Sequence, residues 1–577
     1  MECLYLKFTS LRVGTFKYIG KATAAFLSRK CGGKTMIINR VCKSACADFL
    51  ENAVRGSEAK LIKAASRGAI IVAGVGFSAV SQGMAFDLGP EITADWTNTV
   101  KYTAGVRTGS GNSNNLNDPN SDEIERNFDE GDLVMNRVDL LTELNLKYQN
   151  FTLNLSGAGW YDDVYNSSNS NDSPQTFNPF SVENDQFTSA TKRWAGQSFE
   201  LMNAFVGAQF EPGGMPLSFR LGRHTLLWGE SLFFTDNGIA SAMAPVDVYK
   251  ALSVPNIKAQ EVFLPVNQLS ASALLSDEWT VEAFYQFEWE KSRLPPVGTF
   301  FASTDVLDEG GERIIVGPGA FLYRGSDDEA DAPQFGVSLR WRPAQYNFDL
   351  GLYAIRYNYK EPRVMTELSG GFDPATGSVG TYHLEYKENI ELYGVSVNSS
   401  IDNLNLGAEL SYRHNIPLRV STSVLQPDSL GDTVNAQVSA IYVGNAGMLW
   451  DNITFAGEIA GHKLAKVTRN GDQRDTTLNS FAYGARGVVT LDYYQVAPSL
   501  DLSVPIGIGY VFKGRSPTSG AFGNYGENQG GDVTVGLATT YKQTWQAAIN
   551  YTKFFGNDDD NRYVGRDFVA LTLSTSF

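Results

Sequence analysis

The last eleven residues, Asp567 to Phe577, constrain the fold of this chain more than any other feature. They alternate between two kinds of side chain, as a strand between two different environments does. The apolar face carries Val569, Leu571, Leu573 and Phe577, with Thr575 among them, and the other face carries Ala570, Thr572, Ser574 and Ser576. A membrane barrel needs such strands, because each has lipid on one side and lumen on the other. A half-buried strand at the end of a soluble β-domain shows the same alternation.

The chain ends on an aromatic residue, Phe577. An alternating last strand that ends in Phe resembles the assembly signal of Gram-negative outer-membrane barrels. This resemblance implies that the barrel assembly machinery binds the C-terminal strand and that the folded protein contacts outer-membrane lipid. A closed barrel also requires this strand to pair with the first one, so that no strand edge is left open in the hydrocarbon.

Alternation recurs from Phe86 onward and is clearest between Glu278 and Glu290. One face of this stretch is apolar and the other is acidic or polar, with only Phe284 out of pattern. The first face holds Trp279, Val281, Ala283, Tyr285, Phe287 and Trp289, and the second holds Glu278, Thr280, Glu282, Gln286, Glu288 and Glu290. Aromatic residues at both ends of an apolar stripe are typical of the two membrane interfaces, and we expect Trp279, Trp289 and Trp341 to lie there.

The alternating stretches between residues 86 and 577 amount to about sixteen to eighteen strands. Short connections at 149–150, 342–346 and 541–543 separate some of them, and long polar ones at 108–136, 164–194, 291–332 and 512–530 separate others. Outer-membrane barrels have short periplasmic turns and long external loops. The predicted fold class is therefore all-β, a transmembrane antiparallel β-barrel with an internal non-strand segment.

The first 85 residues differ from the rest in charge and in cysteine content. They hold 13 basic and 4 acidic residues and all four cysteines, whereas the remaining chain has a charge balance of −25. The basic residues Lys60, Lys63 and Arg67 precede an apolar run at 68–80, and small residues follow up to Ala85. This order predicts an export signal peptide cleaved before Phe86, within a presequence of residues 1–85. We assign residues 1–59 no function.

Residues 225–261 interrupt the alternation. They contain two prolines, an expected short helix at 246–252, and the apolar residues Leu226, Trp228, Leu232, Phe233 and Phe234. A long connection with this apolar content does not suit a freely solvated loop. We expect it to fold into the lumen as a plug or constriction. The residues predicted to anchor it in a polar network are Arg220, Arg223, His224, Trp228, Glu230 and Asp247.

Ordered motifs around this segment carry a family resemblance. They include the residue stretches 219–224, 228–231, 244–248, 263–266 and 281–289, together with 128–133 and 136–141 upstream. Together they resemble the domain-of-unknown-function 1302 family of proteobacterial outer-membrane proteins. The resemblance covers most of residues 86–577, although His224 and the Ala244-Pro245 pair depart from the family pattern. It implies a periplasmic carrier and an inner-membrane permease as partners.

Two observations bear on binding and catalysis. The residues predicted to line a pore are Glu278, Glu282, Glu288, Glu290, Arg340 and Arg342, and we expect their charges to be paired. The histidines His224, His383, His414 and His462 are far apart in sequence and fit no metal or hydrolase motif. The acidic balance does not suit nucleic acid. We therefore predict no enzyme activity, cofactor or metal.

The sequence thus predicts an outer-membrane channel that passes a small, apolar or amphipathic molecule. Selection would rest on pore shape, lining charge and an apolar constriction. Three alternatives remain at this point. The first is an open general porin, the second is a barrel enzyme that acts on lipid or ester through His414 or His462, and the third is a soluble β-rich exoprotein.

Overall fold

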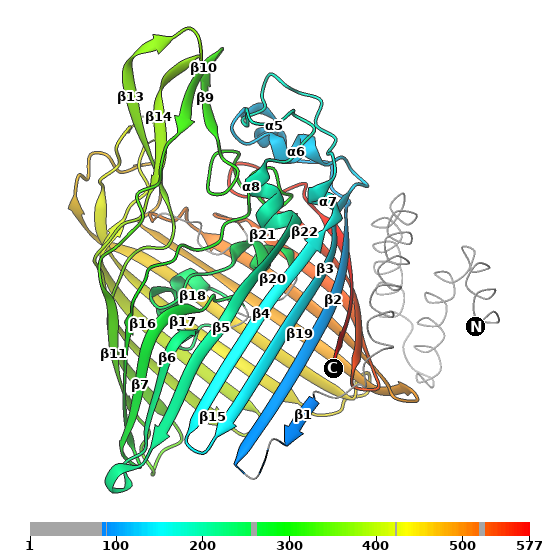
Figure 1. Ribbon diagram of the computed structural model, residues 1–577, viewed down its shortest axis with the longest axis vertical. Helices are drawn as coiled ribbons and strands as arrows, with labels where there is room; N and C mark the ends of the chain where they lie inside the picture. The colour runs from blue at the N-terminus through cyan, green and yellow to red at the C-terminus, as the bar shows by residue number, and fades with distance from the viewer. Residues whose placement is uncertain (1–83, 88, 90, 255–261, 422–423, 519–525) are drawn as a thin grey trace, which may run out of the picture. The chain divides into compact units, whose positions relative to one another are not determined.

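The computed structural model describes residues 84–87, 89, 91–254, 262–421, 424–518 and 526–577 (Figure 1). The predicted signal peptide therefore lies outside the described residues, apart from Met84 and Ala85. No helix within these ranges is long and apolar enough to cross a membrane. The short helices are α5 (Ser113–Asn117), α6 (Glu123–Asn127), α7 (Asp163–Asn166), α8 (Ser189–Thr191) and α9 (Val248–Ser253).

Eighteen antiparallel strands form one closed barrel, which confirms the predicted fold class and strand number. In order around the barrel they are β2 (Ile92–Arg107), β3 (Leu133–Tyr148), β4 (Phe151–Asp162), β5 (Gln197–Phe210), β6 (Leu217–His224), β7 (Val266–Ser276), β8 (Trp279–Gln286), β11 (Gln334–Trp341), β12 (Asp349–Tyr357), β15 (Ile390–Ile401), β16 (Leu404–Pro417), β17 (Leu430–Gly444), β18 (Asn452–Arg469), β19 (Phe481–Ala497), β20 (Leu500–Lys513), β21 (Gly531–Tyr541), β22 (Trp545–Phe555) and β23 (Phe568–Ser576).

The first and last barrel strands pair and so close the sheet. Strand β2 pairs with β23 from Thr99 opposite Ser576 to Arg107 opposite Phe568. The backbone N–H and C=O of Phe577 bond the C=O and N–H of Asn98 at 2.9 and 2.7 Å. Below this point β1 (Met84–Asp87) pairs with the same edge of β2. The edge of β2 therefore continues to be paired beyond the end of β23, as a strand in hydrocarbon requires.

The two faces of the barrel wall differ in polarity. Large apolar side chains are exposed on the outward face, among them Phe199, Leu221, Val337, Leu410 and Ile459. Trp279 and Trp341 are paired in register at the short-turn end, with their rings stacked at 5.7 Å. An apolar band with aromatic residues at its edge is what a barrel in a bilayer presents.

The long connections contain structure that the alternation did not predict. Strands β9 (Arg313–Gly317), β10 (Ala320–Arg324), β13 (Arg363–Asp373) and β14 (Ser378–Glu385) form a separate sheet above the long-loop end of the barrel (Figure 1). We expected a polar loop across 291–332. The signal for β9 and β10 was Pro318-Gly319 between two apolar runs, since Gly319 has a positive φ of 67° and completes the turn.

A charge on the outward face of β23 should weaken the barrel, whereas the same charge on the inward face should not. We expect Leu571→Arg to destabilise the folded barrel by about 2–4 kcal/mol, because the guanidinium would enter the hydrocarbon. Thr572→Arg on the neighbouring inward position is the matched control. Urea unfolding midpoints, read from the heat-dependent gel mobility of the barrel, measure both effects. Equal midpoints for the two variants would contradict this assignment of the faces.

Candidate functional site

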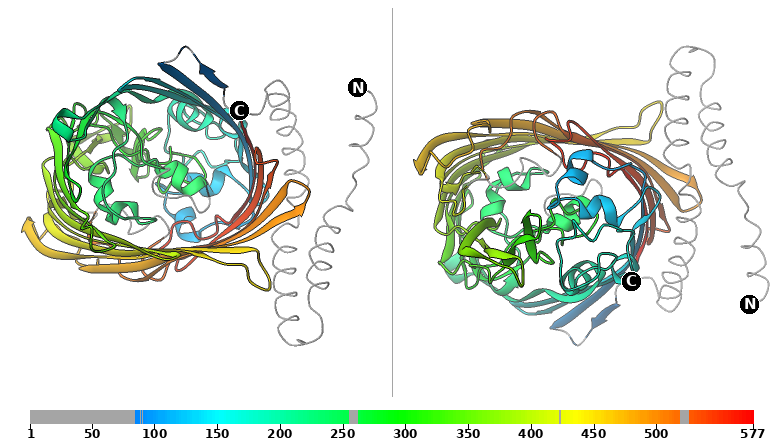
Figure 2. Two further views of the ribbon diagram at one scale, coloured as in Figure 1. Left: turned by 90° about the horizontal axis from the view of Figure 1, so that it is seen from below. Right: turned by 90° about the horizontal axis from the view of Figure 1, so that it is seen from above.

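The connection between β6 and β7 lies inside the barrel. We call residues 225–265 the lumen segment, of which 225–254 and 262–265 are described. Viewed along the barrel from either end, its green ribbon lies within the ring of strands (Figure 2). Its helix α9 begins two residues later than predicted, because the Asp247 carboxylate caps it by accepting from the Lys250 N–H at 2.8 Å. The contacts below show how the wall holds this segment.

Two glutamates of the barrel wall bind the backbone of the lumen segment. Glu458 on β18 accepts hydrogen bonds from three successive N–H groups, those of residues 232, 233 and 234, at 3.2, 2.6 and 2.9 Å. Glu409 on β16 accepts from the N–H groups of Glu230 and Ile239 at 2.8 and 2.9 Å. Both glutamates are buried. Carboxylates that accept several N–H groups form charge-assisted bonds stronger than neutral ones.

An arginine binds backbone carbonyl groups of the same segment, which a carboxylate cannot bind because it has no proton to donate. Arg413, on the same strand as Glu409, donates to the C=O of Asp236, Asn237 and Gly238 at 2.8 to 3.0 Å. The Asn237 amide donates in turn to Gln437 Oε1 on β17 at 3.0 Å. Side chains of the wall therefore provide hydrogen-bond partners for backbone N–H and C=O groups of the segment, as an irregular chain inside a barrel requires.

An apolar core joins the segment to strands β8, β12 and β15 of the wall. Trp228, Ile239 and Met243 pack against inward-facing side chains that include Phe284, Tyr353 and Leu392. The rings of Trp228 and Phe284 meet edge to face at 5.2 Å. Phe284 was the one residue out of pattern in the Glu278–Glu290 stretch. It breaks the alternation because it faces this internal core instead of water.

The residues predicted to anchor the segment in one network lie at different places in the structure. Trp228 and Glu230 belong to it, and Glu230 accepts from Asn398 Nδ2 on β15 at 2.8 Å. His224 is buried in the wall, where it bonds Ser270 Oγ at 2.8 Å, and Arg220 lies over the Phe205 ring at 5.8 Å. Arg223 shares the outward face with Leu221 and forms an ion pair with Glu290, so it is not part of the lumen network.

Asp247 leads to a charged cluster that the sequence did not predict. Arg293, which follows β8, donates to Asp247 at 2.9 Å and to Glu200 on β5 at 2.6 Å. Its guanidinium lies over the Trp194 ring at 5.0 Å. Nothing in the local sequence of Arg293 gives its partners, which lie 46 and 93 residues away.

The predicted pore-lining residues fall into three groups. Glu282 faces inward and accepts from Ser338 Oγ at 3.1 Å, and Arg340 pairs with Asp349 at 2.9 Å. Glu278 and Arg342 lie at the short turns, where Arg342 also binds Asp349 at 2.8 Å. Glu288, Trp289 and Glu290 follow the end of β8, so the predicted strand was too long. Trp289 packs on Tyr386 at 4.6 Å near the external sheet, and not in a girdle of the wall.

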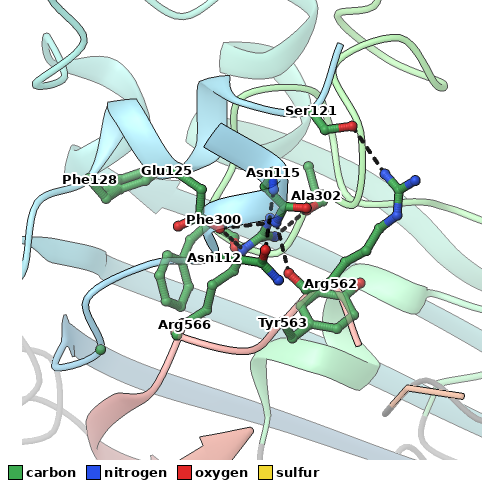
Figure 3. Close-up of polar contacts among 12 residues, drawn as sticks. Asn112, Asn115, Ser121, Glu125, Phe128, Phe300, Ala302, Arg562, Tyr563 and Arg566 are labelled. Atoms are coloured by element: carbon green, nitrogen blue, oxygen red, sulfur yellow. Dashed lines mark hydrogen bonds and ion pairs between the residues drawn. The ribbon is translucent and has the colours of Figure 1, made fainter. Parts of the chain in front are cut away.

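The long loops pack into a cap over part of the barrel. We define the cap as residues 108–132, 163–196, 287–312 and 556–567. At its centre the buried Glu125 carboxylate forms an ion pair with Arg107 and accepts from Arg566 Nε at 2.8 Å and from Asn115 Nδ2 at 3.1 Å (Figure 3). Arg107 also lies over the Phe300 ring at 5.9 Å, and Phe128, Phe300 and Phe301 form an apolar core that Tyr249 and Leu252 of the lumen segment join.

The cap also buries two neighbouring carboxylate residues, Glu123 and Asp305. The Glu123 N–H donates to Asp305 Oδ2 at 3.1 Å, and Glu123 Oε1 accepts from the Asn178 N–H at 2.9 Å. Burial raises the pKa of Asp305 to about 8. Burial and the nearby Asp305 also raise the pKa of Glu123. Among the described residues, no group of three or more acidic, His or Cys side chains is placed to hold a metal ion.

The two histidines considered for catalysis, His414 and His462, each lie within hydrogen-bond distance of another side chain. His462 Nε2 lies 3.2 Å from Ser516 Oγ, but Ser516 is completely buried. His414 Nδ1 lies 2.7 Å from Asp432 on the outward face, and Tyr412 donates to the same carboxylate at 2.6 Å. A hydrolase needs a nucleophile that substrate can reach beside its base. The Ser516 hydroxyl does not meet that requirement.

The chain is similar to one protein family and to several solved structures. The family model described as "Protein of unknown function (DUF1302)" matches residues 64–577. No curated protein matches the chain. Among solved structures, OccAB1 of Acinetobacter baumannii is 10% identical, with 86% of this chain and 98% of that chain covered and a TM-score of 0.42. The outer membrane channel DcaP of the same organism is 10% identical, with 85% and 99% covered and a TM-score of 0.36.

Removing a wall carboxylate should loosen the lumen segment. In Glu458→Ala, we expect the amides of residues 232–234 to exchange with deuterium about tenfold to a hundredfold faster, because each loses a bond to a charged acceptor. Hydrogen exchange with mass spectrometry measures this directly. The control is Glu143→Ala on β3, which should leave these amides unchanged. Unchanged exchange in Glu458→Ala would show that the carboxylate does not hold the segment.

The cap should lose stability as pH rises. The folded-state pKa of Asp305 is raised from 3.8 to about 8, so its contribution to stability is fully present below pH 3.8 and is lost as pH rises through about 8. We expect the thermal unfolding midpoint of the native protein to fall between pH 5 and pH 8. In Asp305→Asn this dependence on pH should be smaller, because the asparagine side chain releases no proton when the protein unfolds. An equally steep decline in the variant would assign the effect to other groups.

Proposed function

Because the chain belongs to the DUF1302 family, whose model matches residues 64–577, we propose a function for it that the family description leaves open. The protein is an outer-membrane channel that passes a small, apolar or amphipathic molecule. The lumen segment narrows the pathway. Selection rests on the shape and chemistry of this constriction, with no covalent step.

One observation carries this proposal: the wall holds the lumen segment by its backbone. Glu409, Glu458 and Arg413 bind N–H and C=O groups of residues 230–239, so the path of this stretch is set through its backbone as well as through the apolar core that Ile239 enters. A plug held in this way is part of the barrel and is fixed at a defined depth. It therefore sets the width of the lumen at that depth.

The apolar character of the segment supports the class of molecule. Leu226, Leu227, Leu232 and Phe233 are only half-buried, although they lie in the lumen segment. A water-filled pore with such residues at its narrowest part admits apolar surfaces more readily than ions, because hydrophobic constrictions exclude water. The charged cluster of Arg293, Asp247 and Glu200 supplies the polar groups that an amphipathic molecule would contact.

Transfer of an apolar molecule across the envelope requires help on the aqueous side. We propose that a periplasmic carrier delivers or accepts the molecule at the short-turn end of the barrel, and that an inner-membrane permease acts further along the same route. The family resemblance in the sequence supports these two partners. That they act together with this protein is part of the proposal.

Single-channel recording of the purified protein in a planar bilayer tests the constriction. We expect a small or absent ion conductance for the native protein, and a conductance several-fold larger for the double variant Glu409→Ala/Glu458→Ala, because the segment loses its anchors. Replacement of residues 226–264 by a short Gly-Ser linker should open the lumen fully. Glu143→Ala is the control and should conduct as the native protein does.

A large, steady conductance of the native protein, unchanged in the double variant, would support an open general porin and sink the constriction. Silence in every variant, including the linker replacement, would mean that the cap closes the barrel. The heat-dependent gel mobility of each variant establishes first that the barrel has folded.

A further inference from the structure

A groove lies on the outward face of strands β17 to β20. It has a volume of about 690 Å³ and an apolar surface. Its floor consists of small residues in register across the strands, since Ala440 pairs with Gly457 and Gly457 pairs with Gly487. The side chains beside the floor are large and exposed: Val438 by 56%, Ile459 by 61% and Ile508 by 52%. The groove faces the bilayer, because the side chain of Glu458 points to the lumen segment on the opposite face.

An aromatic residue closes the lower end of the groove. A Cβ added to Gly457 would lie 2.4 Å from Phe455 Cζ, so the ring lies directly over the glycine. A Cβ on Gly487 would lie 3.4 Å from the same ring. The groove therefore depends on glycine at 457 and ends at Phe455. A rod-shaped apolar chain fits such a groove better than the flat surface of another protein would.

A row of stacked aromatic rings forms the end of the groove toward the long loops, and Tyr510, Phe512 and Phe555 of this row line the groove. Phe512 stacks on Tyr483 at 5.6 Å and meets Tyr510 at 5.2 Å, and Tyr483 stacks on Phe481 at 5.3 Å. Tyr510 also stacks on Phe555 at 6.0 Å. Aromatic belts mark the level of the lipid headgroups. The groove thus lies in the leaflet next to the long loops and opens below its headgroup region.

Exposed lysines stand at the level of these rings. Lys463 pairs in register with Phe481, and Lys513 pairs with Tyr483. Lys553 is two residues from Phe555 and lies 3.6 Å from Asp567. All three lysines are exposed on the strands that border the groove. Each lysine near a membrane surface attracts an anionic headgroup by about 1 kcal/mol, which is roughly a fivefold gain in affinity.

We propose that this surface is a binding site for a phosphorylated acyl lipid of the outer leaflet. One acyl chain occupies the groove between Ile459 and Ile508, and the phosphate contacts Lys463 and Lys513 at the level of the aromatic row. Along the membrane normal the apolar groove is followed by one level that holds both the aromatic row and the lysines, as the acyl chain of such a lipid is followed by its headgroup. A second copy of the chain is a less suitable occupant, because it would have to cover the exposed lysines.

The proposal depends on a membrane-embedded barrel but not on transport. Its test is retention of lipid by the full-length protein purified in detergent, incubated with diphosphoryl hexa-acyl lipid A and examined by native mass spectrometry. We expect a retained adduct on the native protein. Ala485→Phe places a ring on the groove floor, since Ala485 pairs with Ile459 and Tyr510 there, and should lower the retained fraction about tenfold.

A matched variant controls for the new aromatic ring. Ala283→Phe makes the same change on the outward face of β8, away from the groove, and should retain lipid as the native protein does. Ala440→Phe fills the groove from β17 and serves as a second test if Ala485→Phe fails to fold. Both changes add an apolar ring to a face that contacts lipid, which the barrel tolerates.

The headgroup has its own test. Lys463→Gln/Lys513→Gln should lower lipid A retention on the order of tenfold, whereas Lys147→Gln/Lys542→Gln at the short-turn end should not. Phosphatidylethanolamine, which has no net charge, should respond to Ala485→Phe but not to the lysine changes. Equal retention by Ala485→Phe and Ala283→Phe would overturn the proposal, because it would mean general lipid contact only.

Two further results would also overturn it. If the lipid-free native protein is oligomeric and Ala485→Phe makes it monomeric, then the surface is an interface between copies. If inorganic phosphate alone competes for the adduct while the groove variants have no effect, then the lysines bind an anion without an acyl chain. The bilayer conductance of the protein is independent of each of these results.

Discussion

The structure depends on the need to pair every backbone N–H and C=O group inside a bilayer, where water supplies no alternative partner. Pairing of β2 with β23 meets this need for the wall. The same requirement applies to the lumen segment, which has no ladder of its own. The wall residues Glu409, Glu458 and Arg413 supply partners for its N–H and C=O groups. Charged side chains on the inward face of the wall therefore bind the segment's backbone, whereas in an empty barrel they would face water.

The lumen segment and the cap are parts of one packed interior. Tyr249 and Leu252 of α9 lie in the same apolar cluster as Phe300 and Phe301 of the cap. The Glu125 carboxylate, held between two arginines, fixes the first and last loops to each other. Because a buried charge without its partner is costly, this cluster favours one arrangement of the loops over others. The external end of the barrel is therefore a folded layer and not a set of independent loops.

The sequence predicted the wall well because alternation is local and each strand reports its own two environments. It located the lumen segment as well, through the loss of that alternation. It did not predict which side chains hold the segment, because Glu458 and Phe234 are 224 residues apart. Phe284 shows the same limit. It was an exception in the pattern, and only its contact with Trp228 explains it. Trp289 was misplaced because the alternation runs past the end of β8.

Anchoring through the backbone has a consequence for how such a protein can change. Within residues 230–239, substitution of a side chain that does not itself bond or pack against the wall leaves the wall's acceptors and donors untouched, since the bonded N–H and C=O groups are common to nearly all amino acids. Asn237, Gly238 and Ile239 are not such positions, because Asn237 bonds Gln437, a Cβ on Gly238 would lie 2.8 Å from Ser231 Cβ, and Ile239 packs in the apolar core. Related chains can therefore vary the remaining side chains of the lumen segment while the path of its backbone stays constant. The wall residues Glu409, Arg413 and Glu458 would then be inherited as a frame, and the surface that the segment presents to the lumen would vary within it.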